Sequence, residues 1–296
     1  MQQINGWLCF YKERGISSNK ALQLIKRKLN ITKLGYLGTL DPEAEGVLPI
    51  ALGSATRTIF YAEDSLKGYE FSVQFGCETD TCDVEGEKIN FTDTFPTKQN
   101  LEDSLKLFTG EISQVPPIYS AIKINGKRAY ALARENKEFV IPARIVKIYK
   151  LELTNFDALN KTADFFVLCS KGTYVRSLAI DLARKCNSMC YVTEIKRTQS
   201  GKFFIKNAIT LDKLEKLVHN AELKSNLESV DFALDDIPVI EISEQMKQEV
   251  LNGKKIVFKK ENLSPGLYVA KTNEQLVAIG NLSAEIFQPK KVFNNL

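Results

Sequence analysis

One carboxylate stands at the centre of the stretch of the chain that is richest in glycine and proline. Residues 35–53 read GYLGTLDPEAEGVLPIALG, with four glycines and two prolines around Asp41. Glycine lets another chain approach the backbone closely, and Pro42 pushes Asp41 into an extended conformation. Two interpretations follow. Asp41 can cap a helix that has Pro42 at its first position, or a rigid loop can present its carboxylate in a fixed direction for catalysis.

Arg176 is the second unusual residue. The sequence SKGTYVRSLAIDLA predicts a helix that begins after Thr173, which can cap it. The helix dipole disfavours a cation in the first turn by about 0.3–1 kcal/mol, and nothing local offsets this. Arg176 therefore either reaches solvent or forms a bidentate ion pair with a distant carboxylate. Asp41, which has no local partner, is the candidate.

Two tyrosines extend this set of candidates. Tyr69 lies on the apolar side of an alternating stretch, and Tyr174 neighbours Arg176. Packing in the core is the ordinary role for such rings. Both can instead offer a flat face to a nucleobase.

The sequence has few residues for histidine-dependent catalysis or metal binding. The only histidine is His219, so a Ser-His-Asp triad would have to use it and a His-rich zinc site is excluded. The six cysteines form no C-x-x-C pair and the N-terminus resembles no export signal, so we expect reduced thiols and a cytoplasmic protein. No apolar run is long enough to span a bilayer. We predict no metal site.

The elements that position these residues follow from hydrophobic periodicity. Residues 17–30 predict a helix, residues 68–76 a half-buried strand, and residues 164–170 a more apolar strand that leads into the helix of Arg176. Strands and helices are mixed without strict alternation. We therefore predict an α+β fold with a mixed, largely antiparallel central sheet, flanking helices and a catalytic cleft.

The C-terminal part has a different pattern. Short strands are predicted at 254–258, 266–271 and 275–280, separated by turn signals. We place a boundary near residue 237, which gives a catalytic domain over 1–236 and a small β-barrel over 237–296. The length of 296 residues and the 44% hydrophobic content are consistent with two domains.

Charge is unevenly distributed in this chain of net charge +4. Residues 11–36 hold seven basic residues against one acidic, and residues 119–149 hold seven against two, whereas residues 77–93 are acidic. The basic segments favour a face that binds a polyanion, with ordinary solvated surfaces as the alternative. A retaining glycosidase would need two carboxylates about 5 Å apart. Glu43 or Glu45 is close enough in the sequence to be the second carboxylate beside Asp41. The basic segments, however, favour a polyanion as the ligand over a neutral sugar.

Several blocks of the sequence, in order, resemble the TruB family of tRNA pseudouridine synthases. The family signature G-x-L-D-P-x-A-x-G-x-L-P stands as GTLDPEAEGVLP at 38–49, followed by GSATR at 53–57. Further matching blocks are GISSNKAL at 15–22, QVPPIYSAIKINGKRAYALAR at 114–134, CSKGTYVRSLAIDLA at 169–183 and QPKKVF at 288–293. The resemblance covers essentially the whole length.

The resemblance implies roles for individual residues. Asp41 falls on the essential aspartate, and Tyr69 on the active-site tyrosine that contacts the target uracil. Tyr174 and Arg176 fall on the tyrosine and arginine of a G-T-Y-x-R motif, with the arginine paired to the aspartate.

Other positions match the family less closely. Ile195 stands where a leucine lines the uracil pocket, and Lys12 matches the lysine of a K-P-x-G motif. Tyr36 replaces a histidine that is thought to stack into the space left by flipped bases, and its ring can stack too. Glu13 replaces a proline, and Glu43 stands where a hydrophobic residue is common.

The resemblance also implies an activity. It predicts that a uridine in the T-loop of tRNA, at position 55, is flipped out and isomerised to pseudouridine without a cofactor, and that the C-terminal barrel is a PUA domain. We expect a monomer that needs neither a protein partner nor a membrane. The alternatives are a non-catalytic RNA-binding or RNA-folding protein on the same scaffold and the guide-RNA-dependent relative, which usually carries extra terminal segments.

Overall fold

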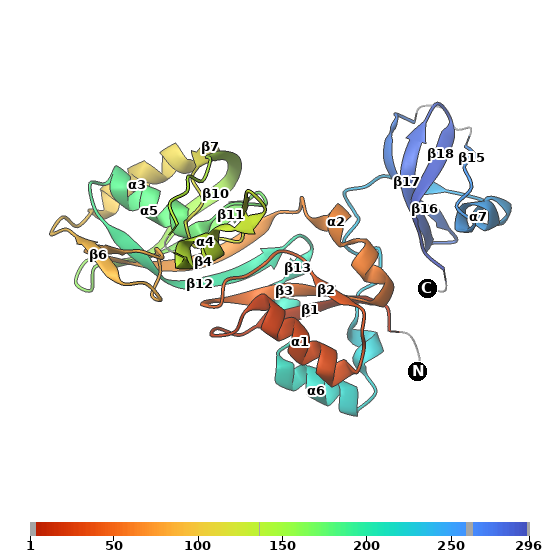
Figure 1. Ribbon diagram of the computed structural model, residues 1–296, viewed down its shortest axis with the longest axis horizontal. Coiled ribbons are helices and arrows are strands. Elements are labelled where there is room, and N and C mark those ends of the chain that lie inside the picture. Colours follow the sequence, from red (N-terminus) through yellow and green to blue (C-terminus); the bar gives the residue numbers. More distant parts are fainter. Residues whose placement is uncertain (1–3, 136, 259–262, 295–296) are drawn as a thin grey trace.

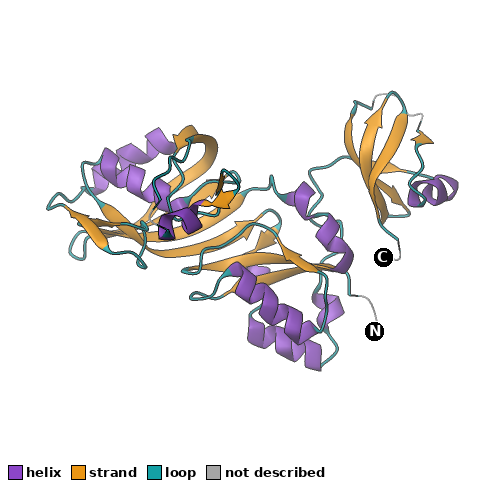
Figure 2. Ribbon diagram, viewed as in Figure 1, coloured by secondary structure: helices purple, strands orange, loops and turns teal. Residues whose placement is uncertain are grey.

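The computed structural model describes residues 4–135, 137–258 and 263–294. A nine-stranded sheet forms its larger part, and helices flank this sheet (Figures 1 and 2). Its main path is β1 (Gly6–Lys12), β3 (Ala44–Leu52), β12 (Cys190–Ser200), β4 (Lys67–Phe75), β11 (Thr162–Cys169), β10 (Arg144–Asp157) and β7 (Gly110–Gln114). β2 (Leu34–Tyr36) pairs with β3, and β13 (Phe203–Phe204) pairs with β12.

The predicted mixed, largely antiparallel α+β fold is confirmed. The strands of this sheet pair antiparallel except β3 and β12, which run parallel where Ile195 lies opposite Ala44. This parallel pairing places the start of β3 beside the middle of β12. The residues just before β3 include Asp41, so the pairing sets where that carboxylate lies.

The alternating pattern of β4 decides which face of the sheet is covered. Tyr69, Phe71, Val73 and Phe75 are buried, while the intervening side chains are more exposed. The Phe71 ring stacks on Phe165 of β11 with 5.1 Å between centroids. α3 (Lys98–Leu105) and α5 (Val175–Lys185) lie together at this end of the molecule (Figure 1), α3 against β10 and α5 against β12. Leu101 of α3 and Leu178 of α5 belong, with Phe165, to one buried cluster between these helices and the sheet.

The helix predicted near residues 17–30 is confirmed as α1 (Ser18–Leu29). Ser17 caps it, because its side chain accepts a hydrogen bond from the backbone N–H of Lys20. α6 (Leu211–His219) packs beside α1 under β1 and β3 (Figure 1), and His219 is exposed at its end. All six cysteines are free thiols.

The predicted cap of α5 is wrong. Tyr174, not Thr173, is the N-cap residue, and the Thr173 hydroxyl donates to the carbonyl of Ser170 instead. The backbone of Tyr174 is bound by a side chain from another strand, Gln114 of β7. A tertiary contact thus replaces the local cap.

Short elements surround the end of the sheet where Asp41 lies. β5 (Cys77–Thr79) and β6 (Lys88–Phe91) form one hairpin, and β8 (Lys123–Ile124) and β9 (Lys127–Arg128) form another that leads into α4 (Ala129–Arg134). α2 (Ile59–Ala62) follows β3 after a short 3₁₀ turn. The remaining 3₁₀ turns are at 106–108, 205–207 and 223–226.

The predicted C-terminal strands form a separate, curled five-stranded sheet at the far end of the molecule from α3 (Figure 1). Its order is β14 (Val239–Glu241), β16 (Gly266–Thr272), β17 (Gln275–Ser283), β18 (Ile286–Val292) and β15 (Ile256–Val257), with α7 (Glu244–Leu251) beside it. One buried cluster contains Trp7 of β1 together with Val269 and Ile279, so the two sheets share apolar contacts. The division at residue 236/237 stays a prediction. No helix in the described part of the chain is long and apolar enough to cross a membrane.

Candidate active site

A cavity of about 550 Å³ opens where the segment before β3 meets the start of α5. Five of the residues predicted from the sequence line it together: Asp41, Tyr69, Tyr174, Arg176 and Ile195. They come from four separate parts of the chain, namely the loop before β3, the strands β4 and β12, and the start of α5. Tyr36 and Lys12 are not among the lining residues.

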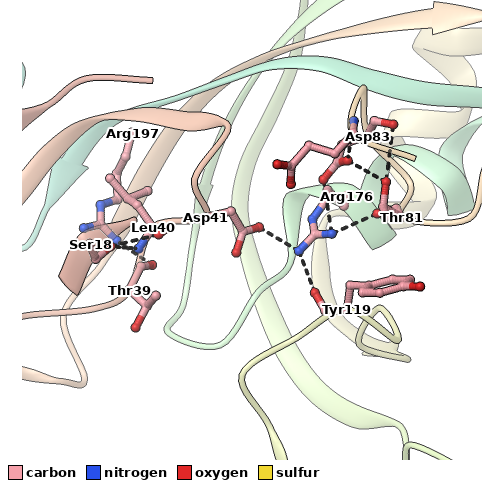
Figure 3. Close-up of polar contacts among 10 residues, drawn as sticks. Ser18, Thr39, Leu40, Asp41, Thr81, Asp83, Tyr119, Arg176 and Arg197 are labelled. Atoms are coloured by element: carbon pink, nitrogen blue, oxygen red, sulfur yellow. Dashed lines mark hydrogen bonds and ion pairs between the residues drawn. The ribbon is translucent and has the colours of Figure 1, made fainter. Parts of the chain in front are cut away.

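Asp41 and Arg176 form the ion pair that the sequence suggests. Arg176 Nη2 lies 2.7 Å from Asp41 Oδ2 (Figure 3). The guanidinium also lies 3.2 Å from Asp83 Oδ2 and donates to the carbonyls of Thr81 and Tyr119. The Arg176 side chain is only 5% exposed, so these contacts compensate a buried charge at the dipole-unfavourable end of a helix.

Sequence reasoning did not single out Asp83. The residue belongs to the acidic stretch 77–93, but nothing local distinguishes it from its neighbours. The turn between β5 and β6 brings it to Arg176, and its side chain is 8% exposed against 39% for Asp41. Arg176 thus joins one buried carboxylate and one that faces the cavity.

The helix-cap interpretation of Asp41 is wrong. Pro42 and Glu43 form a turn, the N–H of Ala44 donates to the carbonyl of Asp41 at 3.2 Å, and the chain continues directly into β3. The reason lies in residues 47–52, which are almost fully buried, pair with β1 and, at 50–52, also with β2, and can satisfy their backbone groups only in the sheet. The rigid-loop interpretation describes the structure.

Lys12 holds the turn at Pro42 and Glu43 in place. Its buried ammonium donates to the carbonyls of Glu13, Ile16 and Pro42. Burial lowers the pKa of Lys12 to about 8. Arg14 and Glu43 add an ion pair of 2.7 Å between the same two loops. Glu13 and Glu43, the two residues that depart from the family pattern, therefore both take part in contacts that hold the Asp41 turn.

Arg197 fixes the other side of the loop and was also missed. It is 1% exposed, and its guanidinium donates to the carbonyls of Gly38, Thr39 and Val47. The Ser18 hydroxyl bonds both the N–H and the carbonyl of Leu40 at 2.8 Å (Figure 3). Backbone groups just before Asp41 are thus held at three successive residues.

Tyr69 and Ile195 form an apolar wall. Tyr69 is 9% exposed, and burial raises the pKa of its phenol, so this group is neutral at ordinary pH. In the sheet, Ile195 pairs with Phe71 and Arg197 pairs with Tyr69. A flat, neutral base fits beside such a wall.

Tyr174 is fixed at the opposite wall by two neighbours. Gln114 donates to its carbonyl at 3.1 Å and accepts from its N–H at 2.8 Å. The Arg144 guanidinium lies over its ring, 4.8 Å from the centroid. Tyr36, in contrast, lies in β2 opposite Ile50 and packs against the core.

The structure brings the second basic segment to the cavity. Ala121 and Ile122 line it, and the hairpin and helix that follow carry exposed basic side chains: Lys123, Lys127, Arg128 and Arg134. Among the residues described, no group of three His, Cys, Asp or Glu side chains is placed to hold a metal ion.

Comparison with known proteins identifies the fold and the family. Residues 26–175 match the N-terminal domain of TruB family pseudouridylate synthase. The chain belongs to the TruB family. It is 41% identical to tRNA pseudouridine synthase B of Rickettsia bellii over 97% of its own length and 98% of that protein. The protein of the same name from Caulobacter vibrioides is 38% identical, with 98% and 96% covered. The chain is therefore a pseudouridine synthase, an isomerase.

Solved structures show the same fold at lower identity. An H/ACA RNP bound to a substrate RNA containing 2′-deoxyuridine includes a chain with a TM-score of 0.76 and 22% identity, covering 98% of this TruB-family chain and 85% of that one. A Cbf5-Nop10-Gar1 complex gives 0.74 and 23%, with 97% and 84% covered. This likeness extends over both sheets.

Proposed function

We propose that this protein isomerises uridine 55 in the T-loop of tRNA to pseudouridine, with Asp41 as the essential residue. The observation that carries the proposal is the Asp41–Arg176 pair of 2.7 Å at a cavity whose other walls are the rings of Tyr69 and Tyr174 and the side chain of Ile195. The names of the relatives, which are tRNA pseudouridine synthases, support tRNA as the substrate.

In this proposal the uridine leaves its stack to enter the cavity. Flipping a base out of its stack costs a few kcal/mol, which stacking on protein rings and contacts to the phosphates offset. Tyr69 and Ile195 would hold the uracil, and the basic hairpin at 123–128 would face the RNA strand. Tyr69 keeps its proton, so its hydroxyl can donate a hydrogen bond to the base or the sugar.

In the chemical step, the bond between N1 and C1′ breaks and the uracil turns. A bond then forms between C5 and C1′. C5 loses its proton to the solvent and N1, no longer bonded to C1′, takes up a proton, so the overall formula is unchanged. Asp41 acts in the cleavage, either as a nucleophile on the sugar or as a base that assists elimination. Arg176 keeps the Asp41 carboxylate oriented by a charge-assisted hydrogen bond.

We propose that the chain acts as a cytoplasmic monomer on the T stem-loop, with residues 1–236 as the catalytic domain and 237–296 as a PUA-like RNA-binding domain. The solved complexes hold their homologous chain among other proteins. The basic segment next to the cavity of this chain, residues 119–149, supports direct recognition of tRNA instead.

Release of tritium from tRNA labelled at uracil C5 tests the proposal directly. Wild type should release tritium in proportion to pseudouridine formed, and Asp41→Asn should release none while it still binds tRNA. Asp41→Asn keeps the size of the side chain and removes its charge, so the binding surface stays intact. No release by wild type, with tRNA still bound, would favour the non-catalytic RNA-binding protein.

A further inference from the structure

Lys67 is a buried cation on the wall of the cavity that the mechanism above does not use. It is the first residue of β4, it lines the cavity, and it is 6% exposed. Its ammonium donates to the Ser65 hydroxyl at 2.7 Å. Among the described residues, no other hydrogen bond and no ion pair within 4.0 Å reaches this nitrogen.

Comparison with Lys12 shows how unusual this is. Both ammonium groups are buried within the same domain, but that of Lys12 donates to three carbonyls. An ammonium has three donors, so Lys12 is satisfied by the protein alone. Lys67 has donors left over at a cavity, and a buried polar group without partners is costly unless something binds there.

One neighbour of Lys67 on this wall is a second cation, Arg197. A Cβ placed on Gly38 would lie 3.7 Å from Lys67 Cε and 3.2 Å from Arg197 Nη1, so both cations flank the loop that leads to Asp41. Arg197 is already occupied by three backbone carbonyls. Lys67 is therefore the cation of this wall that has free donors for an incoming anion.

We propose that Lys67 binds a phosphodiester oxygen of the RNA strand next to the flipped uridine. The inference rests on the proposed function, because it requires RNA in this cavity. A full negative charge compensates a buried ammonium better than a base carbonyl does, and the wall shared with Arg197 favours an anion over a dipole. Asp41 is paired with Arg176, and among the ion pairs of the described residues none within 4.0 Å joins it to Lys67.

The binding contact should depend on pH. The groups around Lys67 are Arg197 of β12, Cys169 of β11, and Glu63, Asp64 and Ser65 of the loop before β4. Burial and the charge of Arg197 lower the pKa of Lys67 to about 7 in the free protein. A bound phosphate favours the ammonium form, so binding above pH 7 requires uptake of a proton. RNA affinity should therefore fall as pH rises above about 7, by up to about tenfold per unit.

Lys67→Met tests the contact, with Lys106→Gln as the control for loss of one positive charge. Lys106 is exposed, pairs with Asp103 and lies beyond the cavity at the end of α3. The dissociation constant of a fluorescent T stem-loop RNA is measured from 50 to 300 mM salt at pH 6.5 and pH 8.5. Lys67→Met should weaken binding about ten- to hundredfold at pH 6.5. It should also lower the salt slope by about 0.7 and abolish the pH dependence. Lys106→Gln should match wild type.

Thermal unfolding separates binding from a structural role. Methionine removes a buried charge that no carboxylate pairs with, so Lys67→Met should unfold at the same temperature as wild type or higher. A lower unfolding temperature with a matching loss of affinity would overturn the inference, as would unchanged affinity. A loss of affinity with an unchanged salt slope would overturn the phosphate in favour of a base contact.

Turnover of wild type in the same preparations separates this inference from the proposed function. No pseudouridine formation by wild type would overturn both. Normal turnover by wild type, together with wild-type binding by Lys67→Met, would overturn only the role of Lys67.

Discussion

Arg176 joins two carboxylates that differ in exposure, and this difference explains how one of them stays available. Asp83 is nearly as buried as Arg176 and neutralises it, while Asp41 is 39% exposed toward the cavity. Without Asp83, the guanidinium would depend on Asp41 alone for compensation. With it, Arg176 binds Oδ2 of Asp41, and in the described part of the chain no hydrogen bond reaches the other oxygen.

Substitution of Arg176 should therefore affect turnover more than affinity. In Arg176→Lys the charge remains, but an ammonium cannot hold both carboxylates and two carbonyls in one plane. We expect single-turnover pseudouridine formation to fall about a hundredfold or more and the dissociation constant for tRNA to change less than about threefold.

Arg184→Lys is the matched control, because Arg184 lies on the same helix and pairs with Glu78 away from the cavity. It should retain wild-type turnover. If Arg176→Lys lost affinity and turnover equally, Arg176 would be a contact to the RNA phosphates and not a positioning group for Asp41.

At the scale of elements, the parallel pairing of β3 and β12 places Asp41 beside Ile195. Gly46 lies opposite Arg197 in this pairing, with φ +105. A Cβ there would lie 2.3 Å from the carbonyl oxygen of Arg197, which is backbone and cannot move aside. The close approach of these two strands therefore requires glycine.

Gly46→Ala should separate the two strands and displace the Asp41 turn. We expect the free energy of unfolding to fall by about 2–4 kcal/mol and turnover to fall with it. Urea unfolding followed by circular dichroism measures the first quantity.

Gly15→Ala provides the comparison. Gly15 also has a positive φ, +83, but nothing lies within 4 Å of an added Cβ. Gly15→Ala should lower the free energy of unfolding by about 1 kcal/mol, because only the backbone conformation is unfavourable. Equal losses for the two variants would show that contact with β12 does not matter.

At the scale of the whole molecule, an exposed basic segment and a buried apolar contact have different roles. The 123–134 segment presents basic side chains beside the cavity, while Trp7 of β1, which is fully buried, joins the nine-stranded sheet to the C-terminal sheet. Trp7 Nε1 donates to the carbonyl of Val230, just before the second sheet begins. Apolar packing thus holds the two sheets together, and the basic side chains beside the cavity remain exposed.

Affinity for tRNA should therefore fall steeply with salt, and the basic hairpin should carry part of that dependence. Replacing Lys123 and Lys127 together by Gln should lower the slope of log affinity against log salt by about 1.4, since each phosphate contact contributes about 0.7. Filter binding over a salt series measures this slope. Lys98→Gln combined with Lys106→Gln, on α3 and just after it, should leave the slope unchanged. A wild-type slope in the hairpin variant would mean that this segment faces away from the RNA.

The sequence by itself determined the elements and most of the site. Periodicity alone predicted α1, β4 and the C-terminal strands, because local burial patterns follow directly from residue spacing. Arg176 lies in the first turn of a helix, where the dipole disfavours a cation, and this position predicted an ion pair with a distant carboxylate. Asp41 is that carboxylate. Motifs identified the family, which the comparisons confirm.

Only the tertiary structure decided how these residues meet. Local signals predicted a helix cap at Asp41 and another at Thr173, but β3 is buried between two strands and Gln114 binds the start of α5 from a different strand. Asp83, Arg197 and Lys67 enter the site through pairings between segments far apart in the chain. Such partners carry no local signature, because the energy that fixes them comes from burial and charge compensation that exist only when the sheet is assembled.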